Sequence, residues 1–211
     1  MLAIALSPAA AQAPLVYRDT TGGVETGILM TYEEVPGGTI VHSVVADGDR
    51  HDMEIDTTLA TRRYHVASPN RRIDYWVTRE GNMLVVEGIL GGAPVSRRIA
   101  ISPLPWYQVM ERSLHDYLVG GARGELTFWI MNPWEASAYL MRAASEGNQL
   151  ISVNGRRVSA LTIRLRPTGV FQPFWSALYW YRPDDGFFLR YEAVRGFPGT
   201  PLTVIEFMGT D

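Results

Sequence analysis

Short runs in which apolar and polar residues alternate fill most of this chain, and turn signals separate one run from the next. A period of two is typical of strands that bury one face. In the first half it predicts strands at residues 24–35, 39–46, 52–58, 61–67, 72–79, 83–90 and 95–101. Asp47-Gly48 and Gly91-Gly92 supply turns, because these residue types tolerate a positive φ. The pattern predicts a meander of sequential antiparallel strands.

The meander is interrupted after residue 105, where the apolar spacing becomes that of a helix. The apolar positions are Trp106, Val109, Met110, Leu114, Tyr117 and Leu118. Gly120-Gly121 follows directly and is a typical helix stop. We therefore expect one amphipathic helix over residues 106–119.

Residues 133–146 fit two interpretations. Asn132 and Pro133 have the pattern of a helix cap and first turn, which would give a short helix over 136–144. Alternatively, residues 137–145 form a strand that turns at 146–148 into a second strand, 149–153. The hairpin rhythm that continues into 158–166 favours the strand. Further strands are predicted at 125–131, 174–181, 187–194 and 202–207.

The first thirteen residues have the pattern of an export signal. An apolar run from Leu2 to Leu6 is followed by Ala11-Gln12-Ala13, whose small residues suit a signal peptidase that cuts near Pro14. We expect residues 1–13 to be a signal-peptide remnant and residues 14–211 to form a single β-rich domain. The expected location is periplasmic or secreted.

Composition removes several classes of protein. No apolar run approaches the ~20 residues that a membrane-spanning helix needs, so we expect a chain that does not span the membrane. The chain has no cysteine, which excludes disulfides, thiol nucleophiles and a lipid-acceptor cysteine. All 19 basic residues are Arg, so Schiff-base chemistry on Lys is excluded. A net charge of −3 provides no field that attracts nucleic acid.

The densest motif is an aromatic hairpin over residues 171–191. Alternation places Trp175 and Tyr179 on one face and Phe174 and Trp180 on the other. Since both faces are apolar, the hairpin is either covered on both sides or lines a cavity. We expect Trp175 to be packed more deeply than Tyr179. The aromatic candidates for ligand binding are Trp175, Tyr179, Trp180, Phe188, Tyr191 and Trp76.

Adjacent arginines occur at 62–63, 71–72, 97–98 and 156–157. A period of two sends the two members of a pair to opposite faces, so one of each pair can point inward. Arg63 and Arg98 are then candidates to bind a carboxylate or phosphate head group. Alternatively, these arginines cover the outer face and pair with Asp and Glu.

Catalytic and metal-binding signals are weak. The run from Asp47 to Asp52 lacks the order of a calcium loop and is interpreted as a polar hairpin tip. The histidines have no spacing that places two ligands on one helix face, although His42 and His65 could meet across strands. Nucleophile elbows, phosphate loops and dinucleotide fingerprints do not occur in the sequence. We therefore expect no catalytic residue, no metal and no cofactor.

One segment carries a resemblance to known families. The sequence Trp180-Tyr-Arg-Pro-Asp-Asp-Gly-Phe-Phe-Leu-Arg-Tyr191, with the turns at Glu146-Gly147 and Asn154-Gly155, resembles exported bacterial half-barrel families of unknown function. It is similar to domain of unknown function 3108 and, more distantly, to lipoprotein-carrier half-barrels. The resemblance implies a curved antiparallel sheet, and in the carriers such a sheet holds acyl chains.

These features predict a mostly β protein, with a single curved antiparallel sheet or open half-barrel wrapped around one central helix. The expected interior residues are Ile40, Val44, Ile55, Tyr64, Trp76, Val85, Trp129, Ile163, Trp175, Tyr179, Leu189 and Ile205. The expected function is an exported, non-catalytic binding or scaffold protein of the bacterial envelope, with a lipid or other apolar ligand in its concave face. The alternative is an envelope protein–protein interaction module with no small ligand.

Overall fold

Fourteen β-strands and two short α-helices make up the part of the chain that the structure, a computed structural model, describes: residues 13–169, 175–194 and 200–210. The strands of the first half are β1 (Leu15–Thr21), β2 (Val24–Val35), β3 (Gly38–Val45), β4 (Arg50–Asp56), β5 (Thr61–Ser68), β6 (Ile73–Glu80), β7 (Met83–Leu90) and β8 (Ala93–Ala100), with a 3-10 turn at Pro69–Arg71. The helices α1 (Met110–Ser113) and α2 (His115–Val119) precede β9 (Glu125–Asn132), β10 (Ser137–Val153), β11 (Arg156–Pro167), β12 (Ala177–Tyr181), β13 (Phe188–Val194) and β14 (Leu202–Thr210). The proposed leader up to residue 12, and Phe171 and Phe174 of the aromatic hairpin, lie outside the described residues.

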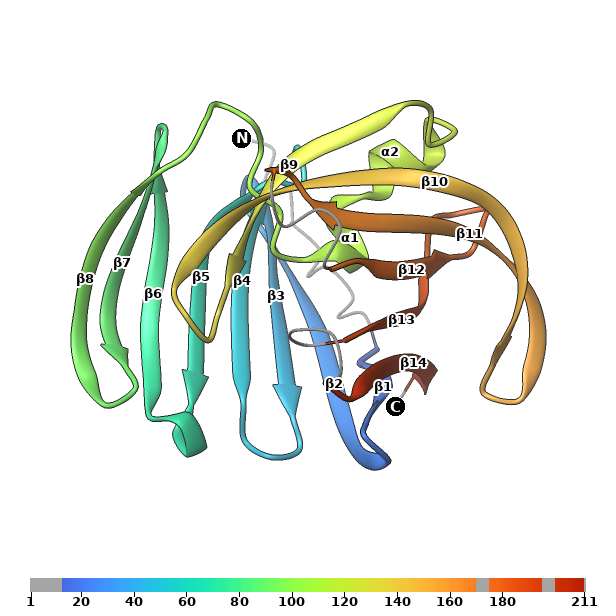
Figure 1. Cartoon of the computed structure of the whole chain (residues 1–211), viewed down its shortest axis with the longest axis horizontal. Coiled ribbons are helices and arrows are strands. Elements are labelled where there is room, and N and C mark those ends of the chain that lie inside the picture. Colours follow the sequence, from blue (N-terminus) through green and yellow to red (C-terminus); the bar gives the residue numbers. More distant parts are fainter. Residues whose placement is uncertain (1–12, 170–174, 195–199, 211) are drawn as a thin grey trace, which may run out of the picture.

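All fourteen strands belong to one antiparallel sheet. Its order is β8-β7-β6-β5-β4-β3-β2-β1-β14-β13-β12-β11-β10-β9, so β1 and β14, from the two ends of the described chain, pair in its middle. Strands that follow each other in sequence pair with each other, except β8 and β9, which form the two ends. The sheet is therefore a curved half-barrel that opens between β8 and β9. Figure 1 shows its two halves, with α1 lying between them.

The connection from β8 to β9 covers one of these ends. The amide of Tyr107 donates to the carbonyl of Trp129 in β9, and the amide of Trp129 donates back to Pro105. On the other side, the amide of Thr61 in β5 donates to the carbonyl of Trp106 at 2.7 Å. The buried Trp106 thus joins β9 to β5 across the interior.

The inner face of the sheet carries the main core. Alternate residues of β4–β7 point inward and are almost fully buried, and the two helices add Met110, Leu114 and Leu118 to the same cluster. The inward residues of β4–β7 include Met53, Ile55, Tyr64, Val66, Tyr75, Val77, Leu84 and Val86. A core built from both halves explains why the sheet curves around the helices.

Both faces of the aromatic hairpin β12–β13 pack against other parts of the protein, which agrees with the first of the two alternatives that the sequence left open. Tyr179 and Tyr181 face the main core, whereas Trp180 and Leu189 belong to a second cluster with Val153 and Ala160. Those last two residues lie in the far part of the β10–β11 hairpin, so that part packs on the outer face of β12 and β13. A hydrogen bond from Arg190 to the carbonyl of Ser152 joins the same two hairpins.

The helix prediction is correct in place and wrong in length. Residues 106–109 are not helical, and a break at Leu114 leaves α1 and α2 with four and five residues. Trp106 and Tyr107 are held by β9 and β5 in an extended conformation, so their sheet contacts override the helical spacing of their apolar side chains. The strand at Leu15–Thr21 was not predicted.

The strand interpretation of residues 137–145 is confirmed, but the turn predicted at 146–148 is wrong. β10 continues through it as one strand of 17 residues, with a shift of register between Ser145 and Gly147. Gly147 has φ +82°, which marks a β-bulge rather than a hairpin.

The predicted interior is correct at Ile55, Tyr64, Ile163 and Tyr179, which are buried in the main core. Trp129, Trp175 and Ile205 are partly buried against that core, and Leu189 is buried in the second cluster. The prediction is wrong for four residues, Ile40, Val44, Trp76 and Val85. On their strands the residues that face inward are Val41, Tyr75, Val77, Leu84 and Val86. Adjacent apolar residues on these strands left the buried face ambiguous, and a shift of one residue reverses every side chain.

Candidate functional site

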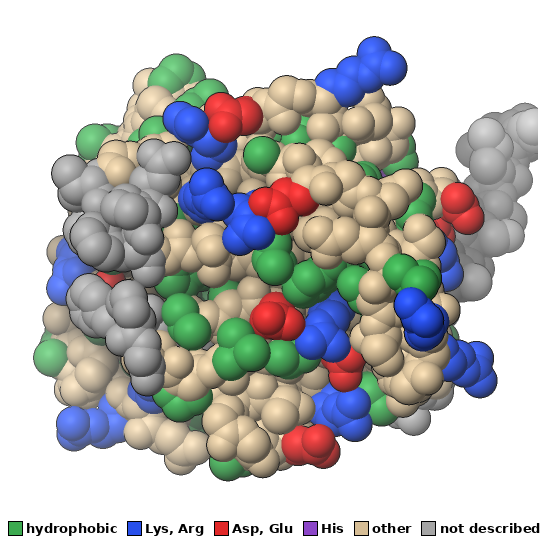
Figure 2. All heavy atoms as spheres, turned by 45° about the vertical axis from the view of Figure 1, so that its right-hand side comes forward, with side chains coloured by type: hydrophobic (Ala, Val, Ile, Leu, Met, Phe, Trp, Pro, Cys, Tyr) green, Lys and Arg blue, Asp and Glu red, His purple; other side chains and the backbone are tan. Residues whose placement is uncertain are grey.

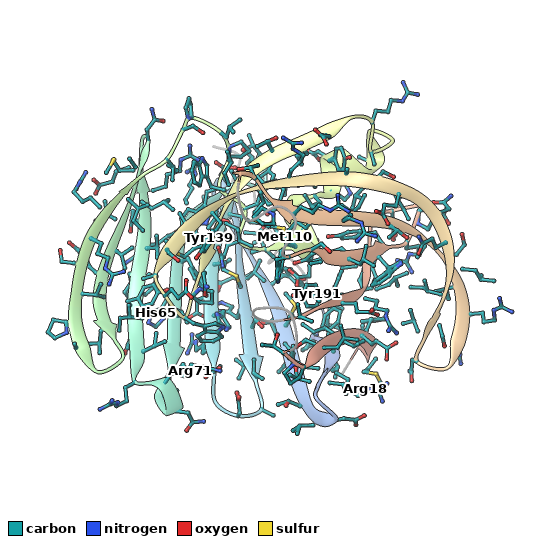
Figure 3. The ribbon with its side chains drawn as sticks, viewed as in Figure 1. Arg18, His65, Arg71, Met110, Tyr139 and Tyr191 are labelled. Carbon is teal, nitrogen blue, oxygen red and sulfur yellow. The ribbon has the colours of Figure 1, made fainter. Side chains whose placement is uncertain are left out.

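A wall of aromatic side chains lines the concave face of β1, β12, β13 and β14. Phe188 lies at its centre, with its ring centroid 5.5 Å from that of Tyr17, 6.1 Å from Tyr179 and 5.8 Å from Tyr181. Tyr191 packs edge-on against Tyr179 at 4.9 Å. Figure 3 shows Tyr191 and Met110 near the middle of the molecule, between the two halves of the sheet.

The wall is not sealed. Ile28, Trp175, Tyr191, Ile205 and Phe207 all pack against the main core, yet each keeps part of its surface accessible. Tyr17 pairs directly with Ile28 and Phe207 across the sheet, so these two side chains point to the concave side as well. Apolar surface therefore remains open on that side. The surface over β10–β14, which comes forward in Figure 2, shows apolar side chains between acidic and basic ones.

Glu111 of α1 places a carboxylate on the same concave side. Its side chain is surrounded by protein, and burial raises the pKa of Glu111 above its ordinary value, with its own main-chain amide partly offsetting the effect. Burial likewise raises the pKa of Tyr17, Tyr32, Tyr179 and Tyr181, and in each case the charge of Glu111 adds to the shift. Glu111 thus lies within electrostatic reach of four tyrosine hydroxyls.

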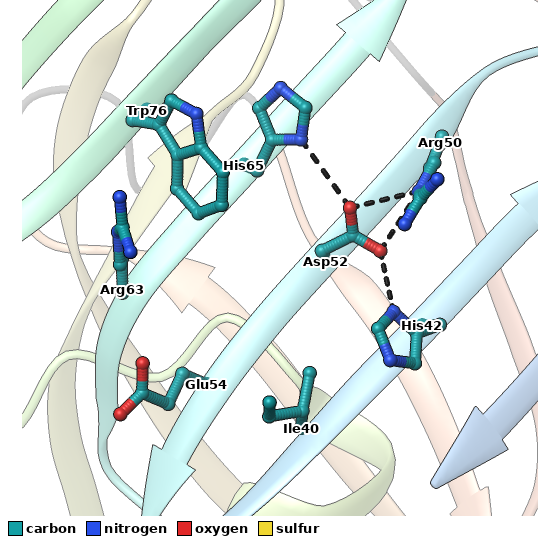
Figure 4. A pocket seen from close by; sticks show the side chains of 8 residues that line it. All are labelled: Ile40, His42, Arg50, Asp52, Glu54, Arg63, His65 and Trp76. Atoms are coloured by element: carbon teal, nitrogen blue, oxygen red, sulfur yellow. Dashed lines mark hydrogen bonds and ion pairs between the residues drawn. The ribbon is translucent and has the colours of Figure 1, made fainter. Parts of the chain in front are cut away.

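A second concave feature lies on the outer face of β3–β6. Its volume is about 430 Å³, and it is lined by Ile40, His42, Arg50, Asp52, Glu54, Arg63, His65 and Trp76. β3, β4 and β5 contribute residues two apart and β6 contributes Trp76, which pairs with His65, so all eight side chains leave the same face of the sheet (Figure 4). We call this the outer pocket.

Asp52 is the centre of the outer pocket. Its carboxylate accepts hydrogen bonds from His42 Nδ1 at 2.6 Å, from His65 Nδ1 at 3.3 Å and from Arg50 Nε at 3.0 Å. Burial raises the pKa of Asp52, but these three donors outweigh burial and hold it below its ordinary value. Both oxygens of the Asp52 carboxylate are therefore engaged by donors of the protein, and a ligand would have to compete with them.

His65 is also fully engaged. Its Nε2 lies 2.8 Å from Oδ1 of Asp74, so both ring nitrogens face carboxylates, and both can donate only when the ring carries two protons. Its ring stacks on Trp76 at 4.4 Å, and the guanidinium of Arg63 lies 3.9 Å from the centre of a Trp76 ring. The outer pocket is therefore a network that ties four strands together through its own members.

The open question of whether His42 and His65 meet across strands has a clear answer. They meet through Asp52, one on each side of it (Figure 4). Among the described residues, no group of three His, Asp or Glu side chains is placed to hold a metal ion. Asp52 belongs to this network, so the interpretation of residues 47–52 as a hairpin tip holds for Asp47 to Asp49 and is wrong for Asp52.

The candidate residues from the sequence fall into separate places. Trp175, Tyr179, Phe188 and Tyr191 come together on the concave wall. Trp180 lies on the opposite face of the same hairpin. Trp76 and Arg63 belong to the outer pocket, and Arg98 pairs with Glu80 at 3.0 Å on the outer face.

Sequence reasoning missed Glu111, Tyr17 and Tyr32 on the concave side and Asp52 in the outer pocket. The available signal for Glu111 was that a polar residue stands within an otherwise apolar helical pattern. Such a residue is ordinarily expected to face solvent, so the signal did not single it out. Tyr17 lay in a strand that was not predicted.

The fold and the concave wall define a β-barrel-like protein built on one open antiparallel half-barrel. Among solved structures, the chain is similar to a beta-barrel-like protein of domain of unknown function DUF1849 from Brucella abortus, with a TM-score of 0.62 and 9% sequence identity over 96% of this chain and 99% of that one. It is also similar to the hypothetical lipoprotein YmcC from Escherichia coli (K12), with a TM-score of 0.47 and 10% identity over 94% of this chain and 85% of that one. No protein-family model and no curated protein matches the chain.

At these identities the likeness concerns the fold. The predicted curved antiparallel sheet or open half-barrel is confirmed, both by the sheet itself and by the solved barrel-like structure. The likeness to domain of unknown function 3108 and to lipoprotein carriers stays a prediction. No helix among the described residues has the length and apolar character needed to cross a membrane.

Proposed function

We propose that this protein is an exported, non-catalytic binding protein of the bacterial envelope that holds an apolar or acylated ligand against its concave face. One observation carries the proposal: the inward-pointing side chains of Ile28, Tyr191, Ile205 and Phe207 remain partly accessible although they adjoin the main core. When a ligand covers apolar surface on the inside of a curved sheet, that surface leaves water and the free energy of the complex is lowered.

The proposed contact residues are Trp175, Tyr179, Phe188 and Tyr191. Tyr179 and Phe188 are mostly buried and form the floor, whereas Tyr191 and Trp175 keep accessible surface. The proposal does not include four of the candidates from the sequence, Trp76, Arg63, Arg98 and Trp180. They lie on the outer face and cannot reach the same ligand.

Binding of the neutral apolar dye N-phenyl-1-naphthylamine tests the proposal. Tyr191→Ala should weaken binding by about fivefold or more, since about 1 kcal/mol of aromatic contact would be lost. Val204→Ala is the matched control, because Val204 lies next to Ile205 on β14 and points to the other face. Equal affinity of both variants and the unaltered protein would contradict the proposal.

Native mass spectrometry of protein purified from cells gives a second test. A copurifying lipid mass supports the binding function. A bare mass together with a captured envelope protein supports the alternative, an interaction module without a small ligand.

The alternative has one structural observation in its favour. Among the described residues, β8 pairs with β7 alone and its other edge has no strand beside it, whereas the β9 edge is covered by residues 105–107. An open edge can pair with a strand of another protein, although Pro94, Arg97 and Arg98 make this edge a poor general template.

A further inference from the structure

The outer pocket contains a second row of side chains, which the Asp52 network does not use. Across the sheet, Ile40 of β3 pairs with Glu54 of β4, and Glu54 pairs with Arg63 of β5. This row runs beside the row that contains Asp52, and its three side chains line the same concavity of about 430 Å³. That volume lies within the range of small-molecule sites, so this part of the pocket has room for a ligand.

Glu54 and Arg63 carry opposite charges at directly opposite positions, yet they do not pair with each other. Neighbours of this kind on one face of a sheet ordinarily attract each other. Here Arg63 turns away from Glu54 toward Trp76, and no ion pair or hydrogen bond joins the two charged groups (Figure 4). Within the described part of the chain, neither group forms an ion pair or hydrogen bond with any other residue. Both charges are therefore available to a ligand.

Stacking holds the Arg63 side chain in place. Its guanidinium carbon lies 3.9 Å from the centre of a Trp76 ring, and the indole in turn stacks on His65 at 4.4 Å. Hydrogen bonds to Asp52 and Asp74 fix His65. A guanidinium that rests on an aromatic ring can still bind a carboxylate or phosphate through two parallel N–H groups. Because the stack already orders the side chain, less conformational entropy is lost on binding.

The charges that a ligand meets in the outer pocket are one basic and one acidic group. Arg50 and Asp52 also line the pocket, but they neutralise each other at 2.9 Å. The partly accessible carboxylate of Glu54 can accept hydrogen bonds from an ammonium group, and it repels a simple anion that approaches Arg63. The pocket therefore favours a ligand that carries both charges.

Apolar surface adjoins the two charged groups. Ile40, on the far side of Glu54, is half-buried, and Trp76 is 38% exposed although it is stacked. An aliphatic group of a ligand that covers Ile40 would leave water and add to the affinity. The site thus combines two opposite charges with a small apolar surface.

We propose that the outer pocket binds a small zwitterion, whose acidic group pairs with Arg63 and whose ammonium group pairs with Glu54. A free α-amino acid has this chemistry, and so does the glycerophosphoethanolamine head group of a lipid. The amino acid with an aliphatic side chain also covers Ile40. This site lies on the opposite face of the sheet from the concave wall, so it is independent of the apolar ligand proposed there.

The indole signal of Trp76 in proton–nitrogen correlation spectra of the full chain gives a site-specific test. Its absence from the spectrum of Trp76→Phe assigns it. The probes are leucine, N-acetylleucine, leucinamide and glycerophosphoethanolamine. N-acetylleucine lacks the ammonium group and leucinamide lacks the carboxylate, so each keeps one of the two charges. We expect leucine to shift the Trp76 signal and to bind at least about tenfold more tightly than N-acetylleucine or leucinamide.

Two variants separate the two charged contacts. Glu54→Gln, which leaves the stack on Trp76 intact, should weaken leucine binding at least about tenfold and leave N-acetylleucine binding nearly unchanged. Arg63→Gln should weaken leucine binding and leave leucinamide binding nearly unchanged. Arg98→Gln is the control, because Arg98 lies on the same outer face but pairs with Glu80 away from the pocket.

Three results would overturn this proposal: equal binding of leucine and its two derivatives, no shift of the Trp76 signal with any probe, or unchanged leucine affinity in Glu54→Gln. Tighter binding of glycerophosphoethanolamine than of leucine would support the pairing with Arg63 and Glu54 and assign the ligand to a lipid head group. Each of these results leaves the proposed function of the concave wall standing, because the Trp76 signal reports on the outer face alone.

Discussion

The hydroxyl of Tyr181 donates a hydrogen bond of 3.0 Å to the main-chain carbonyl of Met110, and this bond joins β12 to the start of α1. Both residues are buried. A helix of four residues has little stability of its own, because nucleation is costly and few hydrogen bonds offset it. The position of α1, and with it that of Glu111, therefore depends on tertiary contacts such as this one.

Tyr181→Phe should lower the free energy of unfolding by about 1–3 kcal/mol, since it leaves a buried carbonyl without a donor. Urea denaturation followed by tryptophan fluorescence measures the change. Tyr139→Phe is the control: its hydroxyl bonds Glu135 near the surface, and its loss should cost less than about 0.5 kcal/mol. Equal costs at the two sites would contradict the structural role given to Tyr181.

Local sequence was sufficient to predict most of the sheet. Alternation marks the strands from β2 to β8, and Gly-containing turns mark the hairpins β2–β3, β3–β4, β6–β7 and β7–β8, where each strand pairs with its neighbour in sequence. The pairing of β1 with β14 joins residues almost two hundred positions apart, and no local pattern indicates such a pair. The same limit applies to Trp106, whose extended conformation is set by β5 and β9 rather than by its neighbours in sequence.

The candidate site was predictable in part. The aromatic hairpin is visible in the sequence because large apolar residues occupy both the odd and the even positions of its strands, so that both faces are apolar. Glu111 was not, because its surroundings include Tyr17 and Tyr32 from the β1–β2 hairpin and Tyr181 from β12, and no local pattern brings these together with α1. Asp52 was hidden for a similar reason, since its partners His42 and His65 come from the strands on either side.

Glu111→Gln should stabilise the protein at neutral pH. A carboxyl pKa that is higher in the folded than in the unfolded chain means that the folded state binds the proton more tightly. As the pH falls from 7 through the folded pKa of Glu111, the unaltered protein should therefore gain stability relative to the variant. Urea midpoints measured between pH 7 and pH 4 should differ most at pH 7 and converge below; a less stable variant at pH 7 would contradict the burial of an unpaired charge.

Asp52→Asn should have the opposite dependence on pH. The pKa of Asp52 is lowered by its donors, so its contribution to stability is complete above the ordinary carboxyl pKa and is lost as the pH falls through the folded value. At pH 7 we expect a loss of roughly 1 kcal/mol, allowing for solvent screening of a network near the surface. Asp184→Asn, in an exposed turn, is the control and should change stability little at any pH.

Gly38→Ala tests the close approach of β3 to β4. A Cβ at Gly38 would collide with the main-chain carbonyl oxygen of Ile55, which cannot move without breaking the ladder. We expect a loss of about 1–3 kcal/mol in urea denaturation. Gly27→Ala serves as the control, because no atom lies within 4 Å of its added Cβ, and it should be neutral or slightly stabilising.

Trp175 and Tyr179 reverse the order of packing expected from the sequence. Tyr179 is 8% exposed and touches Tyr181, Phe188 and Tyr191, whereas Trp175 is partly accessible and held by a hydrogen bond from its indole N–H to the carbonyl of Val194. Tyr179→Ala should therefore cost about 3–5 kcal/mol and Trp175→Ala about 1–3 kcal/mol, since less of its ring leaves water on folding. Denaturation of both variants in urea, with Trp76→Ala on the outer face as a further comparison, measures the difference. A larger loss at Trp175 than at Tyr179 would show that the concave wall is packed in another way, and that Trp175 forms its floor rather than its rim.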